Sequence, residues 1–191
     1  MSTTPSTTPS TTPSPPPSVA PLDVQMLQTA AALENLAVKL YAIAAGLPAT
    51  ASGQQGLRAL ITQNQAHHTA HADAFNGASV AAGGTAQHAA DPRYTDLTQR
   101  VAAIKDPVSL ATLLEEVEDL MAQTFARFAP LAGSTAARSL LVGTASVEAQ
   151  HSSELLIVRA LPDGSGVGTA GIPRAVYPTA EASAVNEGAV R

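Results

Sequence analysis

The sequence of 191 residues contains no cysteine and no tryptophan, and only three phenylalanines and three tyrosines. Without cysteine the chain can form no disulfide, no thiolate metal site and no cysteine nucleophile. Ten lysines and arginines stand against fifteen acidic residues, which gives a net charge of -5, and the basic residues form no run. A nucleic-acid footprint requires a basic patch, so we expect no nucleic-acid partner. No apolar run reaches the roughly 18 residues of a transmembrane helix.

The two ends of the chain have compositions that disfavour a packed core. Residues 2–13 repeat Ser-Thr-Thr-Pro three times, and we interpret residues 1–20 as a disordered arm. Residues 162–191 are rich in glycine and proline and predict an extended tail that packs partly on the domain. Ser/Thr/Pro spacers often separate a surface anchor from a folded domain. We therefore expect a secreted or cell-surface protein whose signal segment is not part of this chain, while a cytoplasmic location stays open.

The stretch between these ends, residues 21–161, is rich in alanine and leucine and predicts one all-α domain. Turn and capping signals divide it into four long helices, expected over about 23–46, 52–82, 107–131 and 135–161. The connection over residues 83–106, with a short helix near 94–104, is much longer than the other two. One long crossover between the second and third helices distinguishes a ferritin-like four-helix bundle from a simple up-and-down bundle.

Local signals mark the expected helix ends. Asp106-Pro107 combines a capping side chain with proline at the first helical position, which is a strong helix start. Gly83-Gly84 predicts a helix stop. Asp23 is the expected cap of the first helix, and Ser52 with Gln55 forms the expected capping box of the second.

Glu148 and His151 lie three residues apart in the fourth predicted helix, so their side chains project from one face. Leu141 and Leu155 lie seven residues before and after Glu148, which places the pair inside an apolar stripe. A buried carboxylate without a partner costs several kcal/mol or gives up its charge. We therefore expect polar partners on the other helices.

Each of the other three helices offers a metal-capable residue within its own apolar stripe. Glu34, His68 and Glu118 each have apolar residues seven positions before and after them. His71 follows His68 by one helical turn. At 1.5 Å per residue, the polar residues of each antiparallel helix pair lie at similar heights in the bundle.

The two halves of the domain also form a weak internal repeat. The alignment pairs residues 34–41 with 118–125, and residues 68–75 with 148–155. It selects Glu118 over Glu115 and Glu116, and it selects His68 and His71 over His67.

This arrangement resembles the ferritin-like superfamily, whose dinuclear sites take a glutamate from each of two helices and a Glu-x-x-His motif from each of the other two. Residues 22–161 are similar to the ferritin-like domain of bacterial secreted or lipid-anchored proteins and of plant desiccation-related proteins. Residues 171–190 are similar to the C-terminal segment of actinobacterial members. The resemblance implies these metal ligands: Glu34, His71, Glu118, Glu148 and His151.

His68 departs from the family pattern, because it stands where the first Glu-x-x-His motif has its glutamate. A site with His68 has three carboxylates and three histidines instead of four and two. Two divalent ions bring four positive charges, so three carboxylates leave one charge uncompensated. We keep His68 in the predicted ligand set and expect weaker binding at one position, a single ion, or a mixed pair. A neutral imidazole does not bridge as a carboxylate does, so we do not assume the usual di-iron route.

The leading interpretation is a metal-binding protein with a dinuclear or mononuclear site and oxygen- or peroxide-linked redox chemistry or a role in stress protection. The expected metal is a divalent transition ion, with iron first and manganese or zinc as alternatives. A different class of function is a metal-free extracellular helical module with a buried Glu–His network. An iron-storage cage ranks third, since the long arm, the extended tail and the altered site disfavour a closed shell. A homodimer stays open.

Several polar neighbours of these residues carry simpler expectations. His67 is expected at the surface or behind a ligating histidine, and His88 in a solvated loop. Tyr41 is expected to pack in the core above the site. A solvated face of the third helix is expected to include Glu115, Glu116 and Asp119.

Overall fold

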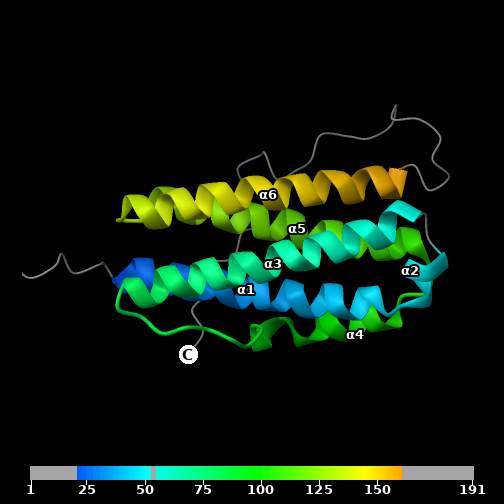
Figure 1. The fold of residues 1–191 in the computed structure, drawn as a ribbon, viewed down its shortest axis with the longest axis horizontal. Helices are drawn as coiled ribbons and strands as arrows, with labels where there is room; N and C mark the ends of the chain where they lie inside the picture. Colours follow the sequence, from blue (N-terminus) through cyan, green and yellow to red (C-terminus); the bar gives the residue numbers. More distant parts are fainter. Residues whose placement is uncertain (1–20, 53–54, 161–191) are drawn as a thin grey trace, which may run out of the picture.

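The computed structural model describes residues 21–52 and 55–160, and four long helices form its frame (Figure 1). These are α1 (Pro21–Ala45), α3 (Gln55–Ala81), α5 (Pro107–Phe128) and α6 (Thr135–Ala160). Shorter elements are α2 (Pro48–Ser52), α4 (Thr95–Ala103) and the 3-10 turns η1 (Pro92–Tyr94) and η2 (Ala129–Leu131). The described ranges contain no strand, so the all-α prediction is confirmed. The predicted arm and tail lie outside these ranges.

The long helices form two antiparallel pairs, α1 with α3 and α5 with α6 (Figure 1). The connection from α3 to α5 runs back along the bundle, so α3 and α5 point in the same direction. Within this crossover, α4 packs against α1. The structure thus has the single long crossover that the sequence predicted. No helix in the described ranges is long and apolar enough to cross a membrane.

The core consists of small and branched aliphatic residues with a few aromatic rings. Alanines such as Ala30 and Ala37 on α1 are fully buried and keep the neighbouring helices close. Phe75 and Phe125 are fully buried, and their ring centroids lie 5.3 Å apart. Each fully buried large apolar side chain stabilises the fold by about 1.5–3 kcal/mol.

Two of the predicted helix ends have the expected chemistry. The carboxylate of Asp106 accepts a hydrogen bond of 2.8 Å from the backbone N–H of Ser109, and Pro107 is the first residue of α5. At the end of α3, Gly83 has a φ of 85°, and the N–H of Gly84 donates to the carbonyl of Ser79 at 2.8 Å. A left-handed glycine after a helix allows this closure.

The predicted cap of the first helix is wrong. α1 begins at Pro21, so Asp23 lies within its first turn and does not cap it. Ser52 is the last residue of an extra short helix, α2, and the two residues that separate it from α3 lie outside the described ranges, so the predicted capping box stays a prediction. The sequence predicted only a turn between the first two long helices. Proline also favours the first turn of a helix, and Pro48 is the first residue of α2.

Asp23 instead joins the beginnings of two helices that are far apart in the sequence. Its side chain accepts hydrogen bonds from the backbone N–H groups of Gly133 at 2.7 Å and Ser134 at 2.9 Å, just before α6. Asp23 is 1% exposed. Burial alone raises the pKa of this carboxyl, but the two backbone donors and the charge of Arg138 outweigh burial and bring the pKa below its ordinary value.

We predict that Asp23→Asn lowers the free energy of unfolding by about 1–3 kcal/mol, since an amide has only one acceptor oxygen for two buried donors. Urea denaturation at pH 7 measures this change. Because the folded pKa of Asp23 is lowered, the wild-type advantage is complete above the ordinary aspartate pKa of about 3.9 and is lost as the pH falls through the folded value. Asp73→Asn on the exposed face of α3 is the control and should change stability by less than about 0.5 kcal/mol. Equal effects of the two substitutions would contradict this role of Asp23.

Candidate metal centre

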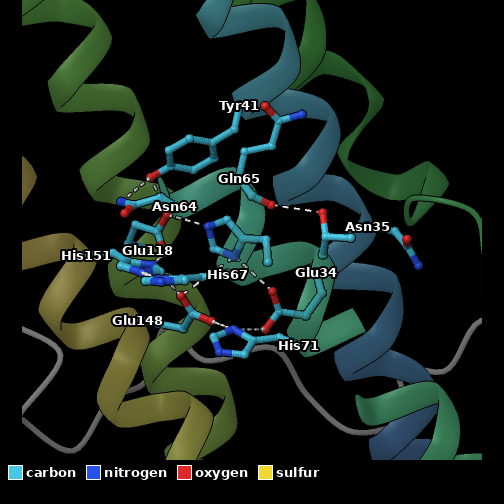
Figure 2. A network of polar contacts seen from close by, with 12 residues as sticks. Glu34, Asn35, Tyr41, Asn64, Gln65, His67, His71, Glu118, Glu148 and His151 are labelled. Atoms are coloured by element: carbon cyan, nitrogen blue, oxygen red, sulfur yellow. Dashed lines mark hydrogen bonds and ion pairs between the residues drawn. The ribbon is translucent and has the colours of Figure 1, made fainter. Parts of the chain in front are cut away.

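The six side chains singled out from the sequence converge inside the bundle (Figure 2). They come from all four long helices: Glu34 on α1, His68 and His71 on α3, Glu118 on α5, and Glu148 and His151 on α6. Five of them are buried, and the side chain of His71 is the most exposed of the six, at 17%. The four-helix convergence inferred from register is therefore present, while the role of these residues as metal ligands stays a prediction.

The contacts divide this cluster into two halves. In the first half, Nδ1 of His71 lies 2.8 Å from Oε1 of Glu148 and 3.5 Å from Oε1 of Glu34. In the second half, Nδ1 of His151 lies 2.9 Å from Oε2 of Glu148 and 3.5 Å from Oε2 of Glu118. Each oxygen of Glu148 therefore faces a different half.

His68 lies between the halves. Its Nδ1 is 2.9 Å from Oε2 of Glu34, and its Nε2 is 2.9 Å from Oε1 of Glu118. The structure consequently offers two overlapping groups of potential ligand atoms, within each of which all atoms lie within 4.8 Å of one another. The first contains Glu34, His68, His71 and Glu148, and the second contains His68, Glu118, Glu148 and His151.

Contacts with carboxylates raise the pKa of all three histidines of the cluster. Burial lowers the pKa of His68, but its contacts with Glu118 and Glu34 outweigh burial and raise the pKa well above its usual range. The same balance, with burial opposed by contacts with two carboxylates, raises the pKa of both His71 and His151 to about 9. At neutral pH without metal, three imidazolium groups therefore face the carboxylates.

The pKa values of the Glu34 and Glu148 carboxyl groups are shifted in opposite directions. Burial, followed by the negative charge of Glu148, raises the pKa of Glu34 to about 7 although His68 and His71 oppose this shift. Burial also acts to raise the pKa of Glu148, but hydrogen bonds from His151 and His71 outweigh it and bring the pKa well below the usual range. Glu148, at the centre of the cluster, is thus the more strongly ionised of the two.

The donor set fits a divalent transition metal. Oε1 of Glu34 and Oε2 of Glu118 are buried and accept no hydrogen bond from any described residue. A buried carboxylate oxygen without a donor is costly, and a cation in each half would satisfy the oxygen of that half. Imidazole nitrogens suit iron and zinc, and carboxylate oxygens suit manganese as well.

Tyr41 has a role that the sequence analysis missed. Its hydroxyl donates a hydrogen bond to Oε1 of Glu118 and accepts one of 3.4 Å from the amide of Asn64 (Figure 2). Burial, followed by the charge of Glu118, raises the pKa of Tyr41 well above its usual range, so the hydroxyl keeps its proton. The available signal was that a buried tyrosine hydroxyl needs a partner.

His67 lies behind His151, which decides between the two expectations for this residue. It is half-buried, and its Nδ1 lies 2.9 Å from Nε2 of His151. Burial and then the nearby charge of His151 lower the pKa of His67, whereas that of His151 is raised. We therefore assign the proton to Nε2 of His151, which donates to Nδ1 of His67.

The expected solvated face of the third helix is partly wrong. Glu116 is exposed as predicted, but Glu115 and Asp119 are only 9% and 5% exposed. Glu115 accepts a 2.8 Å hydrogen bond from Arg159 on α6. The reason is that α5 is covered by α6, α1 and α2, so its buried surface is wider than one apolar stripe. His88 is exposed in the crossover, as predicted.

Comparison with known proteins agrees with this architecture. The chain matches the family model described as the ferritin-like domain over residues 22–160. No curated protein and no solved structure matches the chain. Because the family match covers most of the chain and all four long helices of the bundle, the chain belongs to the ferritin-like domain family.

Proposed function

We propose that this protein binds one or two divalent transition-metal ions at the cluster of three glutamates and three histidines. The observation that supports the proposal most directly is the pair of buried carboxylate oxygens, on Glu34 and Glu118, which accept no hydrogen bond within the described part of the chain and face histidines of the cluster. Iron is the metal we favour, with manganese or zinc as alternatives.

Each part of the chain has a distinct task in this proposal. Glu34 and His71 hold one metal position, Glu118 and His151 hold the other, and Glu148 serves both. Phe75 and Phe125 pack as a fully buried pair seven residues after His68 and Glu118, respectively, and keep water from that end of the centre.

Tyr41 and His67 act through the ligands that they contact. Tyr41 fixes the carboxylate of Glu118 by a hydrogen bond, and His67 holds the ring of His151. With iron bound, the centre would supply electrons for chemistry with oxygen or peroxide, and we propose protection against oxidative stress as the role.

A metal-free helical module is the second candidate, and one observation favours it. Both ring nitrogens of His68, and Nδ1 of His71 and of His151, already lie within 2.9 Å of a carboxylate oxygen. A polar network whose histidines are paired with carboxylates is tolerated in a protein core. In this case the cluster is a structural element, and the function lies on the surface of the bundle.

We predict that Glu148→Gln removes most of the bound metal, because both metal positions lose a charged oxygen. The protein is purified without chelator, loaded anaerobically with ferrous iron, desalted and measured by inductively coupled plasma mass spectrometry. Glu116→Gln is the matched control, since Glu116 is exposed on α5 and lies outside the cluster. Wild type and this control should retain one or two ions per chain.

The outcome for the second candidate differs in both readouts. A metal-free network predicts no retained ion in any variant, while Glu148→Gln lowers the free energy of unfolding by roughly 3–5 kcal/mol because buried histidines lose their partner. Wild-type protein without metal after loading would thus exclude the metal proposal.

We predict that His67→Ala weakens metal binding about tenfold, the lower end of the effect expected for a group that orients a ligating histidine. The loss follows because His151 no longer has an acceptor for its Nε2 proton. Competition with a chromophoric chelator measures the affinity. His88→Ala is the control, since that histidine is exposed in the crossover. Equal affinities for the two variants would show that His67 has no part in the centre.

A further inference from the structure

His68 occupies a place in the cluster that no other histidine shares. It is fully buried and belongs to both groups of potential ligand atoms. Its two ring nitrogens face in opposite directions, Nδ1 toward Glu34 and Nε2 toward Glu118, with both distances 2.9 Å. Each nitrogen thus lies beside a different half of the cluster.

The two carboxylate oxygens of Glu148 likewise face different halves of the cluster. Its Oε1 faces His71 in the half that contains Glu34, and its Oε2 faces His151 in the half that contains Glu118. Each half therefore has four donors of matching chemistry: a ring nitrogen of His68, an oxygen of Glu148, one further histidine and one further glutamate. The internal repeat seen in the sequence corresponds to these two matching halves.

We infer that His68 bridges two metal ions through its two ring nitrogens, one ion in each half. The centre is then a pair of four-donor sites joined by an imidazolate ring and by Glu148, instead of a pair joined by two carboxylates. This inference rests on the metal-binding function proposed above and specifies how the two ions are arranged.

Charge supports a bridging ring. Two divalent ions carry four positive charges, and Glu34, Glu118 and Glu148 supply three negative charges. When both nitrogens of His68 bind metal, the ring has released its N–H protons to solvent and carries the fourth negative charge. The buried centre is then neutral, which it must be to avoid a large desolvation penalty.

A bridging ring would also set the distance between the two ions, which limits how they can react. Metal–nitrogen bonds of about 2.0–2.1 Å on either side of an imidazolate place the ions roughly 6 Å apart. Ions that share one bridging oxygen in two-metal sites lie about 3.5–4 Å apart. A single oxygen atom would therefore not reach both ions held by His68, and each half would supply its own Lewis acid.

X-ray absorption of the zinc-loaded protein tests this arrangement. Wild type should retain two zinc ions per chain and show no zinc–zinc scattering at about 3.5–4 Å. His68→Glu restores a carboxylate at the bridging place and should introduce that scattering. His71→Glu is the matched control, because it makes the same change one turn along α3 at a residue of only one half, and it should show no short zinc pair.

Copper(II) provides a second readout that does not depend on the folding of His68→Glu. Two copper ions joined by an imidazolate ring are magnetically coupled, so wild type should give the electron paramagnetic resonance spectrum of a coupled pair. His68→Ala should give separate copper signals. This measurement also shows directly whether the ring connects the ions.

The outcomes separate this inference from the broader function. Two zinc ions with short zinc–zinc scattering in wild type, one retained ion, or uncoupled copper would each overturn the bridging role of His68 while leaving metal binding intact. The absence of any retained ion would overturn the metal-binding function itself, and the inference with it.

Discussion

The burial of three carboxylates at one level of a helical bundle is the constraint on which the rest of this structure depends. Glu34, Glu118 and Glu148 are each 0% exposed, and uncompensated negative charges in such a place would prevent folding. The compensation comes from histidines on α3 and α6, whose rings reach carboxylates of other helices. The polar contacts therefore fix the axial position of each helix relative to its neighbours. Apolar packing alone would allow the helices to slide past one another.

A second polar contact fixes the same helices at the end of the bundle. Asp23 ties the first turn of α1 to the backbone just before α6, so the two helix pairs are joined both at their centre and at one end. Between these points the core is apolar and includes many alanines. Their small side chains do little to fix how the helices are oriented against one another. The central cluster and the Asp23 contact thus supply specificity that small side chains cannot.

Sequence reasoning identified the bundle and the cluster because both follow from simple periodicities. Glu34 and Glu118 could be found from seven-residue spacing within apolar stripes, and the Glu148–His151 pair from i, i+3 geometry. The capping residue Asp23 was misassigned because a capping side chain in the sequence does not reveal which helix it serves. Only the fold shows that Asp23 serves the start of α6, 110 residues along the chain.

The neighbours of the cluster were less predictable for a related reason. Whether Glu115 faces solvent depends on how many helices cover α5, and α2, which the sequence did not predict, is one of them. The contact of Tyr41 with Glu118 joins α1 to α5, and no local spacing encodes a pairing between these two helices. The bridging role proposed for His68 likewise depends on the direction of its two ring nitrogens, which only the folded structure defines.

The six residues of the cluster and the neighbouring His67 differ in their exposure to solvent. His71 has 17% of its side chain exposed and His67 is half-buried, whereas the carboxylates from α1, α5 and α6 have no contact with solvent. Both of these partly exposed histidines belong to α3. Within the cluster, solvent therefore reaches an imidazole of α3, while the three carboxylates stay enclosed by the bundle.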